Sequence, residues 1–143
     1  MKFQILDKKD DLKDVFDLIK ETFNIDNNST SCLLDNQKVL TIYDKDDLAG
    51  AVIISLLNDP IKCKKGFYLN YVSIKESYRN KGLGKSLMNK VISIAENEKI
   101  DYIRLTSNKE KIIARKMYES IGMKKIDTDL FYYEINGGKH ESI

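Results

Sequence analysis

The sequence predicts an α/β or α+β fold in which a mixed sheet carries helices on both faces. Three observations predict it. Short apolar or alternating stretches are typical of strands, longer stretches repeat apolar residues at helical spacing, and the two kinds of stretch follow one another along the chain. The expected order is β, α, β, β, β, α, β, α, β, without an internal repeat. The 143 residues fit one domain, expected over residues 1–136, with a flexible tail over residues 137–143.

The N-terminal elements are a strand and a helix. Residues 2–6 alternate apolar and polar side chains, as a half-buried strand does. A helix follows, with Asp7 or Asp10 as its N-cap and its end near Asn24. Its apolar side chains fall on one stripe: Leu12, Val15, Phe16, Ile19 and Phe23. Residues 25–37 are polar and favour turns, so at most one short helical turn is expected there.

Three strands are expected in the middle of the chain. Residues 38–43 and 48–57 have strand character and are joined by a short acidic turn at residues 44–47, which favours a hairpin. Residues 66–74 form the third expected strand. The helix after it begins near residue 83, and one face of this helix is apolar: Leu83, Leu87, Val91, Ile94 and Ala95.

The C-terminal part is expected to contain two strands and a helix between them. Residues 102–107 have strand character, and residues 109–121 have an apolar stripe at helical spacing. Gly122 stands where a helix end favours a left-handed residue, a conformation that glycine adopts without steric cost. Residues 130–135, with the sequence LFYYEI, complete the predicted fold as a final strand.

Composition argues against several classes of protein. The longest apolar stretch, residues 48–57, is about half of the roughly 20 residues that a membrane-spanning helix needs, so no membrane contact is expected. The charged N-terminus lacks the apolar core of a signal peptide, which makes the cytoplasm the expected compartment. Cys32 and Cys63 form no CxxC pair and have no histidine nearby, so we expect reduced thiols and no metal site. The basic residues lack an Arg/aromatic pattern, so no nucleic-acid partner is expected.

A glycine-rich stretch, YRNKGLGKSLM at residues 78–88, is a candidate phosphate site. A P-loop requires glycine where Arg79 stands, and a dinucleotide fingerprint requires glycine where Leu87 stands. A strand followed by R-x-x-G-x-G at a helix start suits a third mode, in which successive backbone N–H groups bind a diphosphate. Gly82 and Gly84 lack Cβ atoms, so phosphate oxygens can approach the main chain. A helix entered through a glycine turn would give the same pattern without a ligand.

Two motifs resemble those of the GNAT N-acetyltransferase superfamily. Residues 79–84, RNKGLG, are similar to its acyl-CoA pyrophosphate loop, and residues 114–123, ARKMYESIGM, are similar to its A-x-x-x-Y-x-x-x-G-[FM] helix. They follow the family's order, about 35 residues apart with one strand between them. The resemblance implies a GNAT-like, mostly antiparallel sheet that is splayed in the middle. It also implies an acyltransferase that moves an acetyl group from acetyl-CoA to a primary amine by direct attack.

The resemblance assigns roles to individual residues. The main chain at one strand end would bind the pantetheine arm: Val72, Ser73 and Ile74. The loop would bind the diphosphate: Arg79, Asn80, Lys81, Gly82, Leu83, Gly84 and Lys85. Tyr118 would donate to the CoA sulfur, and the N–H of Ile74 would polarise the thioester carbonyl. Lys111 stands where many relatives carry a pantetheine-binding asparagine, so either Asn108 substitutes or the contact is absent.

The general base and the acceptor are the least defined features. Where relatives often carry a glutamate, this chain has Leu69, Ile103 or Arg104, so no base is assigned. Residues 1–60 carry 7 Lys and Arg against 12 Asp and Glu, whereas residues 61–143 carry 17 against 10. This asymmetry favours a basic half for the polyanionic cosubstrate and an acidic half for a cationic amine. That interpretation requires four acidic residues to face the cleft: Asp26, Asp35, Asp46 and Asp47.

Two alternatives stay open. A non-catalytic module that binds acyl-CoA would retain the loop at residues 79–84 and lack a base, as this chain does. The sequence also leaves homodimer formation open. Consumption of acetyl-CoA in the presence of amines separates an enzyme from a binding module.

Overall fold

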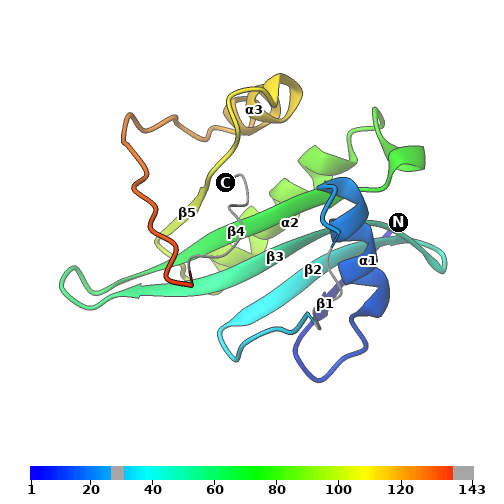
Figure 1. The fold of residues 1–143 in the computed structure, drawn as a ribbon, viewed down its shortest axis with the longest axis horizontal. Helices are drawn as coiled ribbons and strands as arrows, with labels where there is room; N and C mark the ends of the chain where they lie inside the picture. Colours follow the sequence, from blue (N-terminus) through cyan, green and yellow to red (C-terminus); the bar gives the residue numbers. More distant parts are fainter. Residues whose placement is uncertain (27–30, 137–143) are drawn as a thin grey trace.

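The computed structural model describes residues 1–26 and 31–136 of the chain. Strands and helices follow one another there in the predicted order as far as the third helix (Figure 1). In chain order the elements are β1 (Lys2–Leu6), α1 (Lys13–Thr22), β2 (Gln37–Asp44), β3 (Asp47–Asp59), β4 (Lys64–Ile74), the short 3-10 helix η1 (Glu76–Tyr78), α2 (Leu83–Asn97), β5 (Tyr102–Leu105) and α3 (Ile112–Ser120). The predicted tail, residues 137–143 with His140, lies outside the described residues.

The strands of the described chain form one sheet in the order β1-β2-β3-β4-β5. Neighbours pair antiparallel from β1 to β4, and β4 pairs parallel with β5. β2 and β3 form the predicted hairpin, closed by Lys45 and Asp46, and Lys45 has a φ of 55°, as such tight turns require. A parallel pair needs a long crossover, which α2 supplies between β4 and β5. The sheet is therefore mixed but mostly antiparallel.

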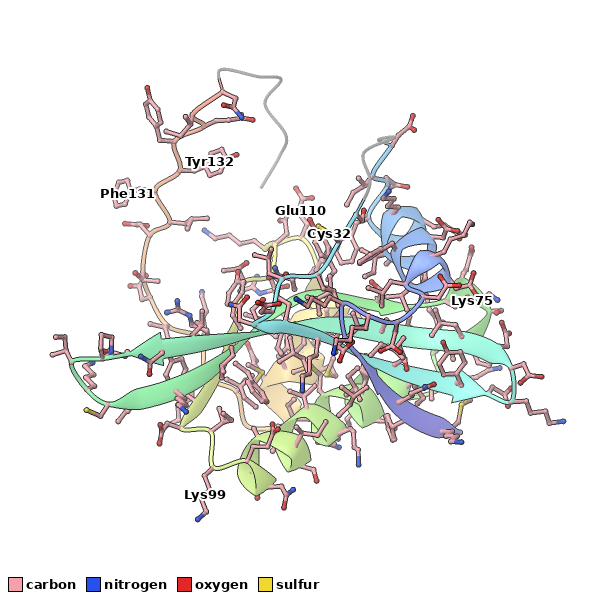
Figure 2. The ribbon with its side chains drawn as sticks, turned by 90° about the horizontal axis from the view of Figure 1, so that it is seen from below. Cys32, Lys75, Lys99, Glu110, Phe131 and Tyr132 are labelled. Atoms are coloured by element: carbon pink, nitrogen blue, oxygen red, sulfur yellow. The ribbon has the colours of Figure 1, made fainter. Side chains whose placement is uncertain are left out.

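Helices cover both faces of the sheet, as predicted, and each face has a hydrophobic core. Figure 2 shows α1, in blue, and α2, in yellow-green, on opposite sides of the strands. α1 packs on β3 and β4, with Val15 and Ile19 buried, whereas α2 packs on β2 to β4 through Leu87 and Val91. Burying each such side chain contributes about 1.5–3 kcal/mol, so both helices are held by their apolar stripes.

β4 changes its geometry halfway along its length. Ile53 of β3 pairs with Asn70 and Ala51 pairs with Ser73, so the register shifts at a β-bulge. Tyr71 in this bulge has a φ of 58°, an uncommon value for a bulky side chain. Beyond the bulge the strand keeps β3 as its partner, but β5 pairs only with residues 66–69. The predicted splay of the sheet is thus present between β4 and β5.

A glycine sets the start of the parallel pair. Gly66 lies opposite Tyr102 in the β4–β5 register. A Cβ atom built on Gly66 would lie 2.2 Å from ring atoms of Tyr102, so only glycine leaves room for the ring. The aromatic ring of the first β5 residue thereby covers the backbone of β4.

Several sequence-based predictions need correction. Residues 130–135 form no strand, and the chain runs there without regular structure. The predicted caps of the first helix are wrong, because Asp7 and Asp10 bond within the preceding turn, where the Asp7 N–H donates to Asp10 Oδ2 at 2.8 Å. Leu12 occupies the N-cap without a side-chain bond. Gly122, with a φ of 97°, has the predicted left-handed conformation.

The sequence argues against a membrane span and a metal site. The structural findings on both concern residues 1–26 and 31–136. No helix in those ranges is both long and apolar enough to cross a membrane. No group of three or more His, Cys, Asp or Glu side chains in the same ranges lies close enough together to hold a metal ion. Cys32 and Cys63 are free and exposed.

Candidate active site

The loop between β4 and α2 is built around left-handed residues. Asn80 and Gly82 have φ values of 62° and 77°, and Arg79 before them is extended. The Arg79 side chain turns back and donates from Nε to the carbonyl oxygen of Ile74 at 3.0 Å. Alternation of extended and left-handed residues turns successive backbone N–H groups toward one side of the chain. Backbone anion-binding sites form in this way.

The loop presents backbone donors that the chain itself does not use. Among the described residues, the N–H groups of residues 80–85 donate no hydrogen bond within the chain. The first helical bond of α2 runs from the Ser86 N–H to the Gly82 carbonyl oxygen at 3.1 Å. A Cβ on Gly82 would meet nothing within 4 Å, so the space in front of this residue is open. These donors and the positive end of the α2 dipole favour an anion.

A polar clasp, formed by Lys75 and Tyr78 with Asp44 and Asp47, ties the loop to the β2–β3 turn. The Tyr78 hydroxyl donates to the carboxylates of Asp44 at 3.0 Å and Asp47 at 2.9 Å, and Lys75 Nζ lies 2.7 Å from Asp47. The hydrogen bond from Lys75, and then that from Tyr78, holds the pKa of Asp47 below its usual value. The hydrogen bond to Asp47 is the main cause that raises the pKa of Tyr78. Sequence reasoning missed this clasp, because its members lie about 30 residues apart and meet only in the fold.

The end of β4 that β5 leaves unpaired leads directly to this loop. Ser73 is fully buried and donates from Oγ to the Tyr71 carbonyl oxygen at 2.9 Å, which braces the bulge. Val72 and Ile74 are half-buried and pack against the core that α2 covers. The structure therefore brings the predicted pantetheine-binding and diphosphate-binding residues together at one end of β4.

Tyr118 lies on α3, on the same side of the sheet as α2. Its half-buried side chain packs against the core that also includes Ile74. The helix is close to the loop, since a Cβ on Gly84 would lie 3.5 Å from Met117 Cε. Burial raises the pKa of Tyr118 above its usual value of 10.0, so the phenol stays protonated at neutral pH. The hydroxyl is therefore a hydrogen-bond donor at the pH at which an enzyme works.

The opposite face of the splay carries aromatic and hydroxyl groups. Tyr71 packs edge-on against Phe23 with 5.1 Å between ring centroids, and Lys111 Nζ lies 3.9 Å from the Phe23 centroid. The Tyr68 hydroxyl and Thr106 Oγ1 are 3.1 Å apart, where β4 and β5 separate. These contacts connect the end of α1 to the start of α3 across the bulge.

The two residues that depart from the family pattern also lie here. Lys111 caps α3 without a side-chain bond to its backbone and instead faces Phe23. Asn108 lies in the turn before α3, where its Oδ1 accepts the Glu110 N–H at 3.1 Å. The side-chain NH2 of Asn108 keeps its donor capacity.

The predicted acidic half does not gather at one cleft. Asp47 is bonded within the clasp, and Asp46 lies in the same turn. Asp35 pairs with Lys8 just before β2 begins, at the opposite end of that strand. Asp26 follows α1. The charge argument for a cationic acceptor is therefore wrong, because acidic residues from one half of the sequence lie at different ends of the sheet in the fold.

The sheet that splays between β4 and β5, with helices on both faces, defines an α/β protein. The sequence matches the Acetyltransferase (GNAT) family over residues 7–123, and the chain belongs to that family. The rat protein N-acetyltransferase family 8 member 3 is 23% identical over 86 residues, which cover 60% of this chain and 37% of the rat protein. The match thus spans little more than a third of that relative.

Solved structures share the fold. An aminoglycoside acetyltransferase from an uncultured soil metagenomic sample, in complex with trehalose, superposes with a TM-score of 0.83 at 17% identity, covering 94% of this chain and 95% of that one. A protein from Clostridium acetobutylicum described as a predicted acetyltransferase, in a structure with acetyl-CoA, superposes with a TM-score of 0.72 at 15% identity, covering 92% of this chain and 95% of that one. At such low identity the likeness establishes the fold.

Proposed function

We propose that this protein transfers an acetyl group from acetyl-CoA to a primary amine by direct attack. The observation that carries the proposal is the row of unused N–H groups at residues 80–85, next to the open end of β4 and to α3. A diphosphate satisfies donors arranged in this way. Family membership supports the acetyl group as the transferred unit, and the Clostridium neighbour with acetyl-CoA supports the donor.

The chain's own groups have separate tasks in this proposal. The loop holds the diphosphate, and the main chain of residues 72–74 bonds to the pantetheine arm as an added strand would. The Ile74 N–H polarises the thioester carbonyl, and Asn108 replaces the missing asparagine through its side-chain NH2. Lys85 and Lys81 add positive charge beside the phosphates.

Tyr118 serves as a hydrogen-bond donor to the departing sulfur. A phenol with a pKa near 10 is a weaker acid than a thiol with a pKa near 8.5, so complete proton transfer costs roughly 2 kcal/mol in water. Burial raises the pKa of Tyr118 further, which makes full transfer less favourable still. Donation of a hydrogen bond as negative charge develops on sulfur requires no such transfer.

The acceptor amine approaches from the α1 side of the sheet in this proposal. Tyr68, Tyr71 and Thr106 offer hydroxyl groups there, where β4 and β5 separate. Relatives of this fold are described as acting on aminoglycosides and on glucosamine-6-phosphate. A small-molecule amine or a peptide amine is therefore the acceptor class to test first.

A non-catalytic acyl-CoA-binding module is the second candidate. The scattering of Asp26, Asp35, Asp46 and Asp47 favours it, because the acids identified from the sequence supply no shared base. Such a module would bind acetyl-CoA and release no thiol with any amine.

The decisive experiment is a thermal-shift series with acetyl-CoA, CoA and ATP. A ligand at about 100 times its Kd adds roughly 2.7 kcal/mol to the free energy of unfolding. We expect a shift with acetyl-CoA and CoA and little with ATP. Stabilisation by ATP alone would contradict the proposal. Thiol release in an amine panel then separates the enzyme from the binding module.

A further inference from the structure

Two cations lie over aromatic rings beside the fork at which β4 and β5 separate. Lys111 Nζ lies 3.9 Å from the centroid of the Phe23 ring, and the guanidinium carbon of Arg104 lies 5.9 Å from the centroid of the Tyr68 ring. At these distances a cation is attracted to the face of the ring. One pair joins the end of α1 to the start of α3, and the other joins β4 to β5. Both cations therefore have defined places beside the fork.

These groups lie on the α1 side of the sheet. Tyr68 and Arg104 are partners in the parallel β4–β5 register, so their side chains point to the same face. Ile103, next to Arg104, packs on the core that α2 covers, so Arg104 points to the opposite face. Figure 2 shows Glu110, which precedes Lys111 in the chain, on the same side of the sheet as α1. This is the side from which the acceptor approaches in the proposed function.

Neither cation is neutralised by a carboxylate of the described chain. Within residues 1–26 and 31–136, no carboxylate oxygen lies within ion-pair distance of the Lys111 ammonium or the Arg104 guanidinium. Both residues are exposed. Residues 104–111 contain one further cation, Lys109, and one acid, Glu110, which leaves this stretch with a net charge of +2. Because an aromatic ring carries no net charge, it positions a cation without cancelling its charge.

Hydroxyl groups add neutral donors next to these charges. The Tyr68 hydroxyl and Thr106 Oγ1 lie 3.1 Å apart, and either atom can be the donor. One of the two protons is used in this contact, which leaves the other for an oxygen of a ligand. Tyr71 is 42% exposed and packs edge-on against Phe23, so a second phenol borders the same face. Cations and hydroxyl donors together suit a group with several acceptor oxygens.

We propose that this face of the fork selects an acceptor amine that carries an anionic group, a phosphate or a carboxylate, and that Arg104 and Lys111 bind that group. The inference rests on the proposed acetyl transfer, because it takes the α1 side as the acceptor side. Arg104 offers a planar set of N–H donors that fits two anion oxygens, and Lys111 offers a compact charge. The same positive charges disfavour acceptors that carry several cations.

Calorimetry on the full chain saturated with CoA tests the proposal without turnover. Glucosamine 6-phosphate and glucosamine are amines that differ by a phosphate, whereas β-alanine and propylamine differ by a carboxylate. We expect the anionic member of at least one pair to bind roughly tenfold tighter, since hydrogen bonds between charged groups are the strong ones. A preference confined to one pair identifies the anionic group, and a preference in both identifies a general anion site. Equal Kd values within both pairs, or no binding of either anionic amine, would overturn the proposal.

Variants assign the preference to the two cations. R104M/K111M keeps long side chains over the rings and removes both charges, so the preference should fall below about threefold. R104K/K111R keeps both charges and should keep most of the preference. The matched control K90M/K99M also removes two cations and should bind as the wild type does. Lys90 Nζ lies 5.6 Å from the centroid of the Phe3 ring on the α2 side, and Figure 2 shows Lys99 on that side too. A preference that survives in R104M/K111M would overturn the proposal.

Thiol release with the same four amines separates this inference from the proposed function. Release with equal Kd values within each pair would leave acetyl transfer standing and refute the selection of anionic amines. Preferential binding without thiol release from acetyl-CoA would support the selection and refute acetyl transfer. In that case the chain is a binding module that recognises anionic amines at the fork.

Discussion

Two irregular segments of this protein differ in how their own chain holds them. The loop at residues 75–85 is tied by the polar clasp and by the Arg79 bond to the Ile74 carbonyl. The segment at residues 124–136 carries large apolar side chains that are exposed. The loop is thus held in shape by its own chain, and such preorganisation lowers the entropy cost of binding a ligand. The second segment has strand-forming residues that pair with no strand in the described part of the chain.

The largest expected effect is on kcat and comes from replacing Tyr118, which lies close to the loop. Tyr118→Phe removes the hydroxyl and keeps the ring in its half-buried position. We expect kcat to fall roughly 100-fold, the lower end of what the loss of one hydrogen-bond donor to developing negative charge costs, while the Kd for acetyl-CoA stays the same. Stopped-flow thiol release and calorimetry measure the two quantities. An unchanged rate with chemistry rate-limiting would remove this role.

The pKa of Tyr118 adds a pH signature to that test. Because burial raises this pKa above 10.0, the phenol remains a donor throughout the neutral and mildly alkaline range. The wild type should therefore show no loss of kcat from this residue below about pH 10. The ratio of the wild-type rate to the rate of Tyr118→Phe should stay constant from about pH 7 to about pH 9, which a pH–rate profile of both proteins measures.

Replacing either of two glycines should have the next largest effect. Gly82 and Gly122 both have positive φ and open space where a Cβ would lie. Gly82→Ala and Gly122→Ala should each cost about 1–2 kcal/mol of stability, because both force a left-handed alanine. Only Gly82→Ala should weaken acetyl-CoA binding, by roughly tenfold, since it disturbs the N–H groups that bind a charged ligand. Equal Kd values for the two variants would argue against the loop as the binding element.

A smaller effect is expected from opening the clasp. Tyr78→Phe removes two hydrogen bonds to Asp44 and Asp47 and leaves every loop residue that faces the ligand. The Kd for acetyl-CoA should rise roughly threefold to tenfold, because the freed loop must be ordered on binding. Tyr68→Phe is the control, since it removes the bond to Thr106 on the other face and should not change this Kd. If both variants bind alike, the clasp does not preorganise the loop.

Lowering the pH should produce the smallest expected change, and this change is in stability. The pKa of Asp47 is lowered in the folded state, so the stability that its ionised form provides is complete above its usual value of 3.8 and is lost as the pH falls through the lower folded value. We expect the Tm of the wild type to fall more than that of Asp47→Asn as the pH is lowered from about 5 to about 3. Asp59→Asn is the matched control, because the pKa of Asp59 is also lowered. Backbone hydrogen bonds in a turn far from the loop lower it.

Much of the fold could be predicted from the sequence because its signals are local. The apolar stripes of α1 and α2, the alternation in β1 and the glycine at the end of α3 each report a structure within a few residues. The prediction of a final strand was wrong for the opposite reason. Residues 130–135 have the side chains of a strand, but strand formation needs a paired edge, and that depends on what lies beside the segment.

The part of the candidate site that consists of backbone groups could be predicted from the sequence. Gly82, Gly84 and Tyr118 occupy fixed places in motifs, and the splay follows from the fold that these motifs imply. The clasp and the scattered acids were not predictable, because each depends on which distant residues the hairpin turn brings together. Net charge over half of the sequence says little about charge in a cleft when β-strands carry neighbours to opposite ends of a sheet.

The pairing of Gly66 with the Tyr102 ring has a consequence for how the protein can vary. The ring fits at one position along β4, so β5 cannot slide by a residue without placing it on a side chain. The fork between the two strands therefore opens at the same place in every molecule, and the distance from that fork to the loop is constant. Gly66 therefore determines where the unpaired part of β4 begins relative to the loop, although Gly66 itself lies in the paired part of the strand.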